Sequence, residues 1–325
     1  MNDKNQELHL VLGAGQIGPR LAELLRGQGH RVRIARRSQS TSRAHGVETV
    51  ALDVRDADAV ARAAEGASVV YHCVNPQYHQ WPELLLPNTR GILEGVARAG
   101  AHLVALDCLY MYGDTTHMHE GSPLAPRSKK GELRVRSADL MLEANAKGTV
   151  PLAIGRAADF FGPDAPLSVL GEHFWTRVRA GKSAQLFGDP DQVHSYSYTP
   201  DVAAALVTLG AARARGVWML PVQPAETTRA LVGRIAHAIG KDIRIGTLPS
   251  WLLRVVGLVQ PMMRELAEMT YQWEQPYVLD DARYRAAFGQ GPTPWNEAIA
   301  ETVRWAQETF DARGTRVQAT DRVVA

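Results

Sequence analysis

Short apolar runs alternate with amphipathic segments along the first half of the chain. The run LHLVL at residues 8–12 precedes a glycine turn, and Leu21, Leu24 and Leu25 then recur at helical spacing. Further apolar runs at 31–38, 47–56, 68–75, 102–113 and 150–162 predict strands, and the segments 56–67, 84–101 and 134–148 between them predict helices. Strands that alternate with helices predict an α/β fold with a Rossmann-type, doubly wound parallel sheet.

The pattern changes beyond Gly162. Helical segments at 168–182, 201–212 and 227–240 are separated by turns rich in proline and glycine. We therefore predict a Rossmann dinucleotide-binding domain over residues 1–162. A smaller, mostly helical substrate lobe follows over 163–313, with some of its strands and helices returning to the Rossmann domain. The tail, 314–325, has no clear pattern and is expected to be flexible.

The glycine turn after the first strand reads GAGQIG and places Gly13, Gly15 and Gly18 in the pattern GxGxxG. A strand before this pattern and a helix after it form the context of a dinucleotide-binding loop. The first glycine permits the tight turn, the second admits the pyrophosphate, and the third lets the helix pack on the strand. We expect Gln16 and Ile17, between the glycines, to contribute to the same site.

The end of the second strand indicates which dinucleotide binds. An acidic residue there would favour the ribose of NAD, but this chain has Arg36 and Arg37. Guanidinium groups suit a 2′-phosphate, so the sequence favours NADP over NAD. Asp53 and Val54, after the next strand, are candidates for the adenine edge. Alternatively, the two arginines are solvated surface residues and Asp53 belongs to a turn.

Composition excludes several other classes of protein. Hydrophobic residues make up 45% of the 325 residues and charged residues 22%, with a net charge of +2. So small a charge does not suggest nucleic acid as a partner. Only two cysteines are present, so neither a disulfide framework nor a zinc site is expected. No secretory signal or membrane-spanning run is apparent, which predicts a cytoplasmic protein without stable membrane insertion.

Taken together, the motifs resemble the extended short-chain dehydrogenase/reductase superfamily, the group of NAD-dependent epimerases and dehydratases. The segments that carry the resemblance are GAGQIG, LDVRD, VVYHCVN, NTRGILEGV, LYMYG, FFGP and YTPDVAAAL. The resemblance implies a small-molecule substrate in the C-terminal lobe and a nicotinamide against the strand ends. It also implies a possible homodimer through helices of the Rossmann domain.

Members of this superfamily normally use a serine or threonine, a tyrosine, and a lysine four residues after the tyrosine. In this chain Pro126, Ser128 and Gly131 keep the register of that motif. The resemblance then places Lys130 at the tyrosine position and Arg134 at the lysine position. Cys108 falls at the serine position, so all three catalytic positions have changed type.

Several residues could supply the proton in place of the tyrosine. Lys130 could do so if burial and Arg134 depress its pKa; alternatively it is solvated, or it binds a phosphate or an acidic ligand. Arg134 can still donate hydrogen bonds to a ribose. Tyr110 is the best tyrosine candidate, because strand alternation would direct it to the same face as Cys108. Cys108 would be nucleophilic only with a depressed pKa.

The substrate pocket is expected where several strands end. After the fourth strand, Asn75 is expected beside the cofactor, and Tyr78 and Trp81 beside the substrate. The resemblance places Asp159 where many members have a substrate-binding asparagine. It places His194 where nucleotide-sugar enzymes commonly have an arginine, which argues against a diphosphate sugar. Further candidates for the pocket wall are Phe160 and His173.

Two functions from different classes follow. The first is an NADP(H)-dependent oxidoreductase or epimerase-type enzyme with an unusual proton donor, in which reduction is favoured over sugar epimerisation. The second is a non-catalytic NADP(H)-binding regulator or scaffold. The aromatic pocket favours the enzyme, whereas the missing tyrosine favours the regulator.

Overall fold

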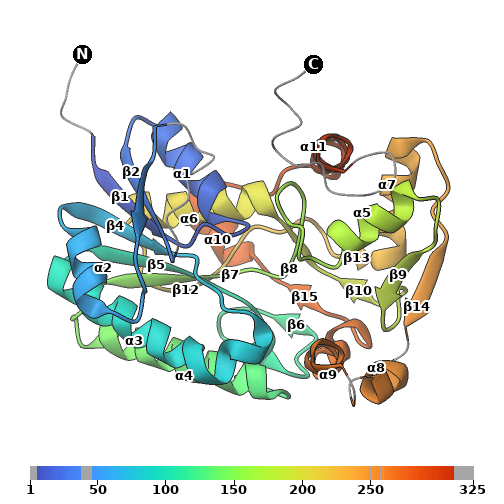
Figure 1. Cartoon of the computed structure of the whole chain (residues 1–325), viewed down its shortest axis with the longest axis horizontal. Coiled ribbons are helices and arrows are strands. Elements are labelled where there is room, and N and C mark those ends of the chain that lie inside the picture. The colour runs from blue at the N-terminus through green and yellow to red at the C-terminus, as the bar shows by residue number, and fades with distance from the viewer. Residues whose placement is uncertain (1–5, 38–45, 249, 257, 259, 311–325) are drawn as a thin grey trace.

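A seven-stranded parallel sheet lies at the centre of the larger part of the molecule (Figure 1). The computed structural model describes residues 6–37, 46–248, 250–256, 258 and 260–310, so the predicted tail at 314–325 lies outside the described residues. Across the sheet the strands are β12 (Gly216–Met219), β7 (Leu152–Arg156), β5 (His102–Asp107), β4 (Ala67–His72), β1 (Leu8–Leu12), β2 (Arg31–Arg36) and β3 (Glu48–Ala51). The prediction of a Rossmann-type α/β fold is confirmed.

Helices cover both faces of this sheet (Figure 1). Strand alternation explains why two apolar layers form. In β1, Leu10 joins a core cluster that contains Val96, whereas Val11 joins a second cluster that contains Leu21. On one face lie α2 (Ala57–Ala64), α3 (Trp81–Ala99) and α4 (Lys129–Ala146), and on the other lie α1 (Gly18–Gly27), α6 (Thr199–Ala211) and α10 (Ala282–Phe288).

The C-terminal lobe combines helices with short strand pairs. Phe161, Phe174, Leu231 and Ile299 belong to its separate apolar core. Three segments of this half of the chain, α6, α10 and β12, lie against or within the Rossmann sheet. The paired strands are β8 (Asp159–Phe161) with β11 (Tyr196–Tyr198), β9 (Ala184–Phe187) with β14 (Ile245–Leu248), β10 (Val193–His194) with β13 (Glu226–Thr227), and β15 (Val278–Leu279) with β6 (His117–Met118). The helices are α5 (Glu172–Arg179), α7 (Thr228–Ile239), α8 (Ser250–Val256), α9 (Pro261–Ala267) and α11 (Trp295–Thr309).

Polar contacts join the lobe to the start of α1. Arg20 of α1 pairs with Glu301 of α11 at 2.8 Å, and the same carboxylate accepts a hydrogen bond from Tyr198. The side-chain oxygen of Gln16, within the glycine turn, accepts a hydrogen bond from the backbone N–H of Leu167 at 3.0 Å. The lobe therefore braces the loop that was predicted to bind the dinucleotide.

The expectation of one strand over residues 102–113 is wrong at its end. Strand β5 stops at Asp107, and Tyr110–Tyr112 form a short 3₁₀ helix, η3. Gly113 follows with a φ of 57°, and a Cβ there would lie 1.9 Å from the carbonyl oxygen of Ala125. The chain thus turns sharply where the loop before α4 crosses it. The alternation argument that placed Tyr110 on the face of Cys108 therefore fails.

None of the helices that the structure describes combines the length and the apolar character needed to cross a membrane.

Three histidines lie buried in neighbouring strands of the sheet. His9 is in β1, His72 ends β4 and His102 begins β5, and all are less than 9% exposed. Burial lowers the pKa of each imidazole to about 4. The folded protein thus holds them neutral at a pH where an unfolded chain would protonate them.

We predict that the free energy of unfolding is insensitive to these histidines above about pH 7 and falls as the pH drops from about 6.5 towards 4. Below about pH 6.5 the unfolded state binds protons that the folded state does not bind. The free energy of unfolding therefore falls by on the order of 1–2 kcal/mol per histidine by pH 5. Urea unfolding of the wild type and of His72→Asn at pH 7.5 and pH 5 measures this. The asparagine oxygen can still accept the Val74 N–H that His72 accepts at 3.2 Å. The variant should lose less stability on acidification than the wild type, whereas the exposed His79→Asn should match the wild type.

Candidate active site at the carboxyl edge of the sheet

The glycine turn between β1 and α1 has the space and the donors that a pyrophosphate requires. Gly13 has a φ of 107°, and a Cβ there would lie 2.9 Å from the Cys73 backbone. A Cβ at Gly18 would lie 1.9 Å from the carbonyl oxygen of Gly13. A Cβ at Gly15 would meet no atom within 4 Å. No side chain caps α1, and its cap residue Ile17 is buried. The first N–H groups of α1 thus have no side-chain partner, and the space beside them at Gly15 is open, so the loop fits a dinucleotide.

The two arginines lie where β2 ends. Arg36 is partly buried and Arg37 is exposed, and neither forms an ion pair with another described residue. Arg55 binds both carboxylate oxygens of Asp53, and this hydrogen bonding lowers the pKa of Asp53. The Asp53 carboxylate therefore has a partner within its own turn and also feels the charge of Arg37, whereas the two guanidinium groups have no ion-pair partner among the described residues. Val54, beside it, is buried in the core.

A buried carboxylate, Asp107, organises the ends of three strands. Arg134 of α4 donates to one oxygen at 3.3 Å, and Arg156 of β7 donates to the other at 3.4 Å. Arg134 also donates to Asn75 at 2.7 Å, and its guanidinium lies 4.3 Å above the ring of Trp81. Asn75, Trp81 and Arg134, predicted separately, are thus brought together beyond the end of β4.

Two tyrosines meet beside this network. The hydroxyl oxygens of Tyr78 and Tyr110 are 2.6 Å apart, and the ring of Tyr110 stacks on Trp81. Burial, more than any other cause, raises the pKa of both hydroxyls. One O–H serves the bond between them, so the pair retains a second proton for another acceptor.

Lys130 makes different contacts from those expected of a proton donor. Its Nζ lies 2.5 Å from a carboxylate oxygen of Glu265 and 2.5 Å from one of Glu268. Its backbone N–H donates to the other oxygen of Glu268 at 3.2 Å, near the start of α4. The ammonium group also lies 5.3 Å above the ring of Tyr78. Lys130 is therefore engaged in ion pairs that fasten the lobe to α4.

Cys108 is not an activated nucleophile. Burial raises the pKa of its thiol to about 12, which is opposite to the depression that nucleophilic chemistry requires. Lys130, a cation of the kind that could lower a thiol pKa, is paired with Glu265 and Glu268. Cys108 packs against the apolar cluster that contains Trp81 and Tyr110.

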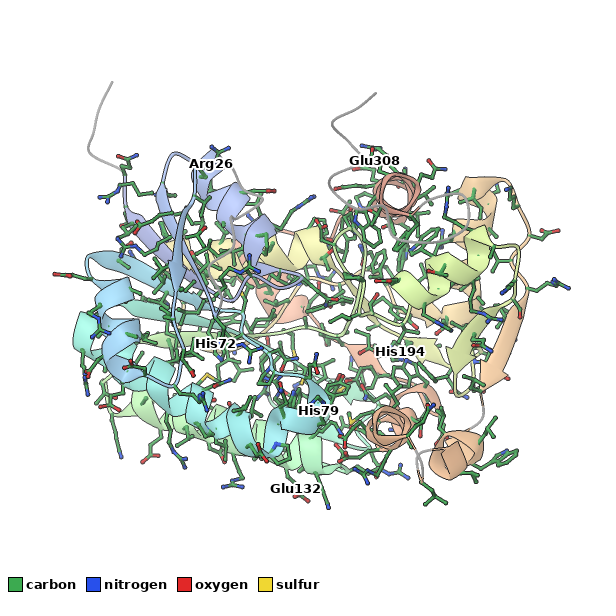
Figure 2. All side chains as sticks on the ribbon, in the orientation of Figure 1. Arg26, His72, His79, Glu132, His194 and Glu308 are labelled. Atoms are coloured by element: carbon green, nitrogen blue, oxygen red, sulfur yellow. The ribbon has the colours of Figure 1, made fainter. Side chains whose placement is uncertain are left out.

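Asp159 and His194 face each other beyond the end of β7. The His194 Nε2 lies 3.1 Å from Asp159 Oδ2, and the ring is almost fully buried (Figure 2). The other two predicted pocket residues lie elsewhere. Phe160 packs against the core cluster that contains Ile17, whereas His173 is exposed on α5 beside Gln185. The structure thus brings Asp159 and His194 together and places His173 apart from them.

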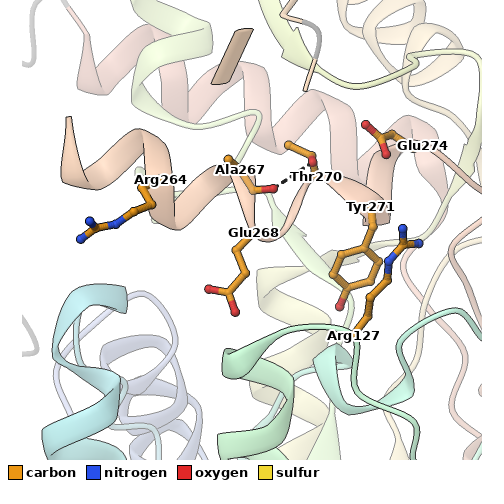
Figure 3. Close-up of a pocket in the computed structure, with 7 residues that line it drawn as sticks. All are labelled: Arg127, Arg264, Ala267, Glu268, Thr270, Tyr271 and Glu274. Carbon is orange, nitrogen blue, oxygen red and sulfur yellow. Dashed lines mark hydrogen bonds between the residues drawn. The ribbon is translucent and has the colours of Figure 1, made fainter. Parts of the chain in front are cut away.

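An open pocket lies on the lobe side of this cluster, between α9 and the loop before α4 (Figure 3). Its volume is about 400 Å³. Tyr271 is one of its walls and belongs to the same apolar cluster as Tyr110, so the pocket adjoins the tyrosine pair. The lining residues are Arg127, Arg264, Ala267, Glu268, Thr270, Tyr271 and Glu274.

Sequence reasoning did not identify the acidic partners of Lys130 or the aromatic residues that stack on His194. Glu265 and Glu268, three apart in a mostly apolar segment, were the available signal. Their partner is more than 130 positions away in the chain, which no local pattern reveals. The sequence assigns no role to Asp107, and Trp273 and Tyr277, which stack on His194, were not identified.

A Rossmann sheet with a glycine loop, and with a polar and aromatic cluster at its carboxyl edge, defines a dinucleotide-binding protein of the α/β class. The chain belongs to the NAD dependent epimerase/dehydratase family, whose model matches residues 9–218. This match confirms the superfamily resemblance and places the chain in a family of enzymes with a nicotinamide dinucleotide as the cofactor class.

Solved structures with the same fold cover nearly the whole chain. DesIV, a dTDP-glucose 4,6-dehydratase from Streptomyces venezuelae, matches 93% of this chain and 97% of its own, with a TM-score of 0.76 at 20% identity. UDP-glucose 4-epimerase from Thermus thermophilus matches 92% and 99%, with a TM-score of 0.75 at 20% identity. Both structures contain NAD. At this level of identity the likeness shows a shared fold.

The curated relatives are two proteins of Arabidopsis thaliana. The 3beta-hydroxysteroid-dehydrogenase/decarboxylase isoform 2 is 25% identical over 254 residues, which cover 71% of this chain and 43% of the relative. Isoform 1 is 25% identical over 182 residues, which cover 52% and 41%. The chain therefore spans less than half the length of these relatives.

Replacement of Lys130 by methionine should destabilise the fold by about 3 kcal/mol, because it leaves two neighbouring carboxylates without their shared cation. Adding Glu265→Gln and Glu268→Gln should recover most of this loss, and urea unfolding measures both effects. The exposed neighbour Lys129→Met is the matched control and should change little. Wild-type stability of Lys130→Met together with lost turnover would instead identify Lys130 as a catalytic acid.

Proposed function

We propose that this protein is an NADP(H)-dependent oxidoreductase that reduces a carbonyl group of a small organic substrate, with Tyr110 as the proton donor. The observation that carries the proposal is the 2.6 Å contact between the Tyr110 and Tyr78 hydroxyls beside the Asp107–Arg134 pair. When bound, the nicotinamide supplies the hydride. The chain must then place a proton donor at the carbonyl oxygen.

Tyr110 suits this role through its environment. Burial raises the pKa of its hydroxyl, so the hydroxyl is protonated at neutral pH but is a weaker acid than an ordinary tyrosine. Donation is still downhill, because the alkoxide that hydride transfer produces is a stronger base than a tyrosinate. Tyr78 holds the hydroxyl in place. The same raised pKa leaves almost no tyrosinate near neutral pH, so the base that the reverse oxidation needs is scarce and reduction is favoured. The curated relatives support a reaction that interconverts a hydroxyl and a carbonyl group, since they are named 3beta-hydroxysteroid-dehydrogenase/decarboxylases.

The neighbouring residues have supporting roles in this proposal. N–H groups at the start of α1 bind the diphosphate, and Arg36 and Arg37 bind the 2′-phosphate. Arg134 has five N–H donors and uses two of them on Asp107 and Asn75, which leaves others for the nicotinamide ribose. A departure of Lys130 and Arg134 from the usual tyrosine and lysine is consistent with a proton donor on another segment.

Replacement of Tyr110 by phenylalanine tests the proton donor. It removes the hydroxyl and keeps the ring that stacks on Trp81. The reaction is followed by NADPH absorbance with ketones, enones and nucleotide-sugars as substrates. We expect kcat to fall about 10²–10⁴-fold while the Kd for NADPH stays the same. Tyr284→Phe removes a buried hydroxyl on α10 and is the matched control. Tight NADPH binding without turnover of any substrate would favour a regulator or scaffold.

The preference for NADP has its own test. Arg36→Ala and Arg37→Ala should each raise the Kd for NADPH by on the order of 10-fold or more, because each removes a charge-assisted hydrogen bond to the 2′-phosphate. The Kd for NADH should not change. Arg31→Ala, at the opposite end of β2, is the control and should bind both dinucleotides as the wild type does. Equal NADPH affinity in all three variants would contradict the proposed preference.

A further inference from the structure

The contacts of His194 fix how many protons the Asp159–His194 pair carries. Nδ1 of His194 lies 3.2 Å from the backbone oxygen of Gln272, and Nε2 lies 3.1 Å from Oδ2 of Asp159. A carbonyl oxygen can only accept, so Nδ1 carries a hydrogen. The Nε2–Oδ2 hydrogen bond then needs one more proton, either on the ring or on the carboxyl group.

Either position of that proton gives the pair no net charge. The pair is an imidazolium with a carboxylate, or a neutral imidazole with a carboxylic acid. The rings of Tyr277 and Trp273 stack on His194, with centroids 4.8 Å and 6.1 Å away, and enclose it. Ser195 and Tyr196, which follow in the chain, are buried as well. A phosphate or carboxylate approaching here would therefore meet no excess positive charge.

One oxygen of Asp159 is left for a ligand. His194 uses Oδ2, and no other described residue donates to Oδ1. The side chain is 15% exposed, whereas that of His194 is 1% exposed, so Asp159 is the member of the pair that reaches open space. Burial is the main cause of the raised pKa values of Tyr78 and Tyr110, and the negative charge of Asp159 adds to both, which places its carboxylate within electrostatic range of the tyrosine pair.

We propose that Asp159 determines specificity by accepting a hydrogen bond from a hydroxyl group of the substrate, and that His194 is a positioning residue that holds the carboxyl group for this contact. The substrate class is then a neutral, hydroxyl-bearing ketone on an apolar ring, without phosphate or carboxylate. The apolar part packs beside Tyr271, which lines the pocket, and Trp273, which share one cluster with Tyr110. This inference rests on the proposed function and names the substrate class for the same site.

Three matched probes test the inference on the wild-type protein. Each is a decalone, a saturated two-ring ketone, that carries a hydrogen, a hydroxyl or a carboxylate on the ring distal to the carbonyl. We expect kcat/KM for the hydroxyl compound to be on the order of 10²-fold higher than for the unsubstituted compound. The difference from the carboxylate compound should be larger still. Calorimetry of the three compounds binding to the protein–NADP complex should give the lowest Kd for the hydroxyl compound and the highest for the carboxylate. Equal values for the three, including no binding of any, overturn the inference.

Variants assign the effect to the two residues. Asp159→Leu removes both carboxyl oxygens and keeps a side chain of similar size. The kcat/KM values of the hydroxyl and unsubstituted compounds should then differ by no more than about threefold, mainly through a change in KM. His194→Leu should lose the selectivity, whereas His194→Gln should retain most of it, because its amide can donate to Asp159. Selectivity that survives Asp159→Leu in folded, NADPH-binding protein overturns the assignment.

The two proposals can fail separately. Turnover that depends on Tyr110 but shows no preference for the hydroxyl compound contradicts the role of Asp159 alone. Selective binding of the hydroxyl compound without turnover contradicts the oxidoreductase and leaves the role of Asp159 supported.

Discussion

The site depends on one buried carboxylate, that of Asp107, held between two arginines. The carboxylate lies at the end of β5, Arg134 lies on α4 and Arg156 ends β7, so one anion joins three elements. Burial of charges is costly unless they are paired, and here each oxygen faces a guanidinium. Arg134 extends the network to Asn75 beyond β4. The segments that carry the tyrosine pair and Asp159 all leave the sheet beside this network, which therefore sets their spacing.

A second polar cluster fixes the lobe against this framework. Glu268 accepts from both the backbone and the ammonium group of Lys130, and Glu265 shares the same cation. The residue that the sequence register places in the catalytic tyrosine slot is therefore used to join α4 to α9. A proton donor, if the site has one, must then come from another element. Tyr110 and Tyr78 supply hydroxyls close by, on segments that follow β5 and β4.

How much the sequence could predict depended on how local each feature is. The glycine loop and the arginine pair after β2 are set by neighbours in the chain, and both were placed correctly on their elements. Strand alternation failed at Tyr110, because β5 ends at Asp107 and Tyr110 lies in the 3₁₀ helix η3. The acidic partners of Lys130 and the aromatic rings around His194 come from the distant lobe. Only the folded chain brings these residues together.

The charges around the tyrosine pair are satisfied by one another. The cluster of Lys130 with Glu265 and Glu268 has one excess negative charge, and Asp107 with Arg134 and Arg156 has one excess positive charge. The Asp159–His194 pair adds none. These three clusters provide hydroxyls, one carboxyl oxygen and aromatic faces, and each of their described cations faces a carboxylate. In apolar surroundings hydrogen bonds distinguish substrates more strongly than apolar contacts do, because an unmatched polar group loses its hydration without compensation. If the proposed function holds, this arrangement selects substrates by hydrogen bonding to neutral groups, whereas Arg36 and Arg37, where β2 ends, lie outside these clusters.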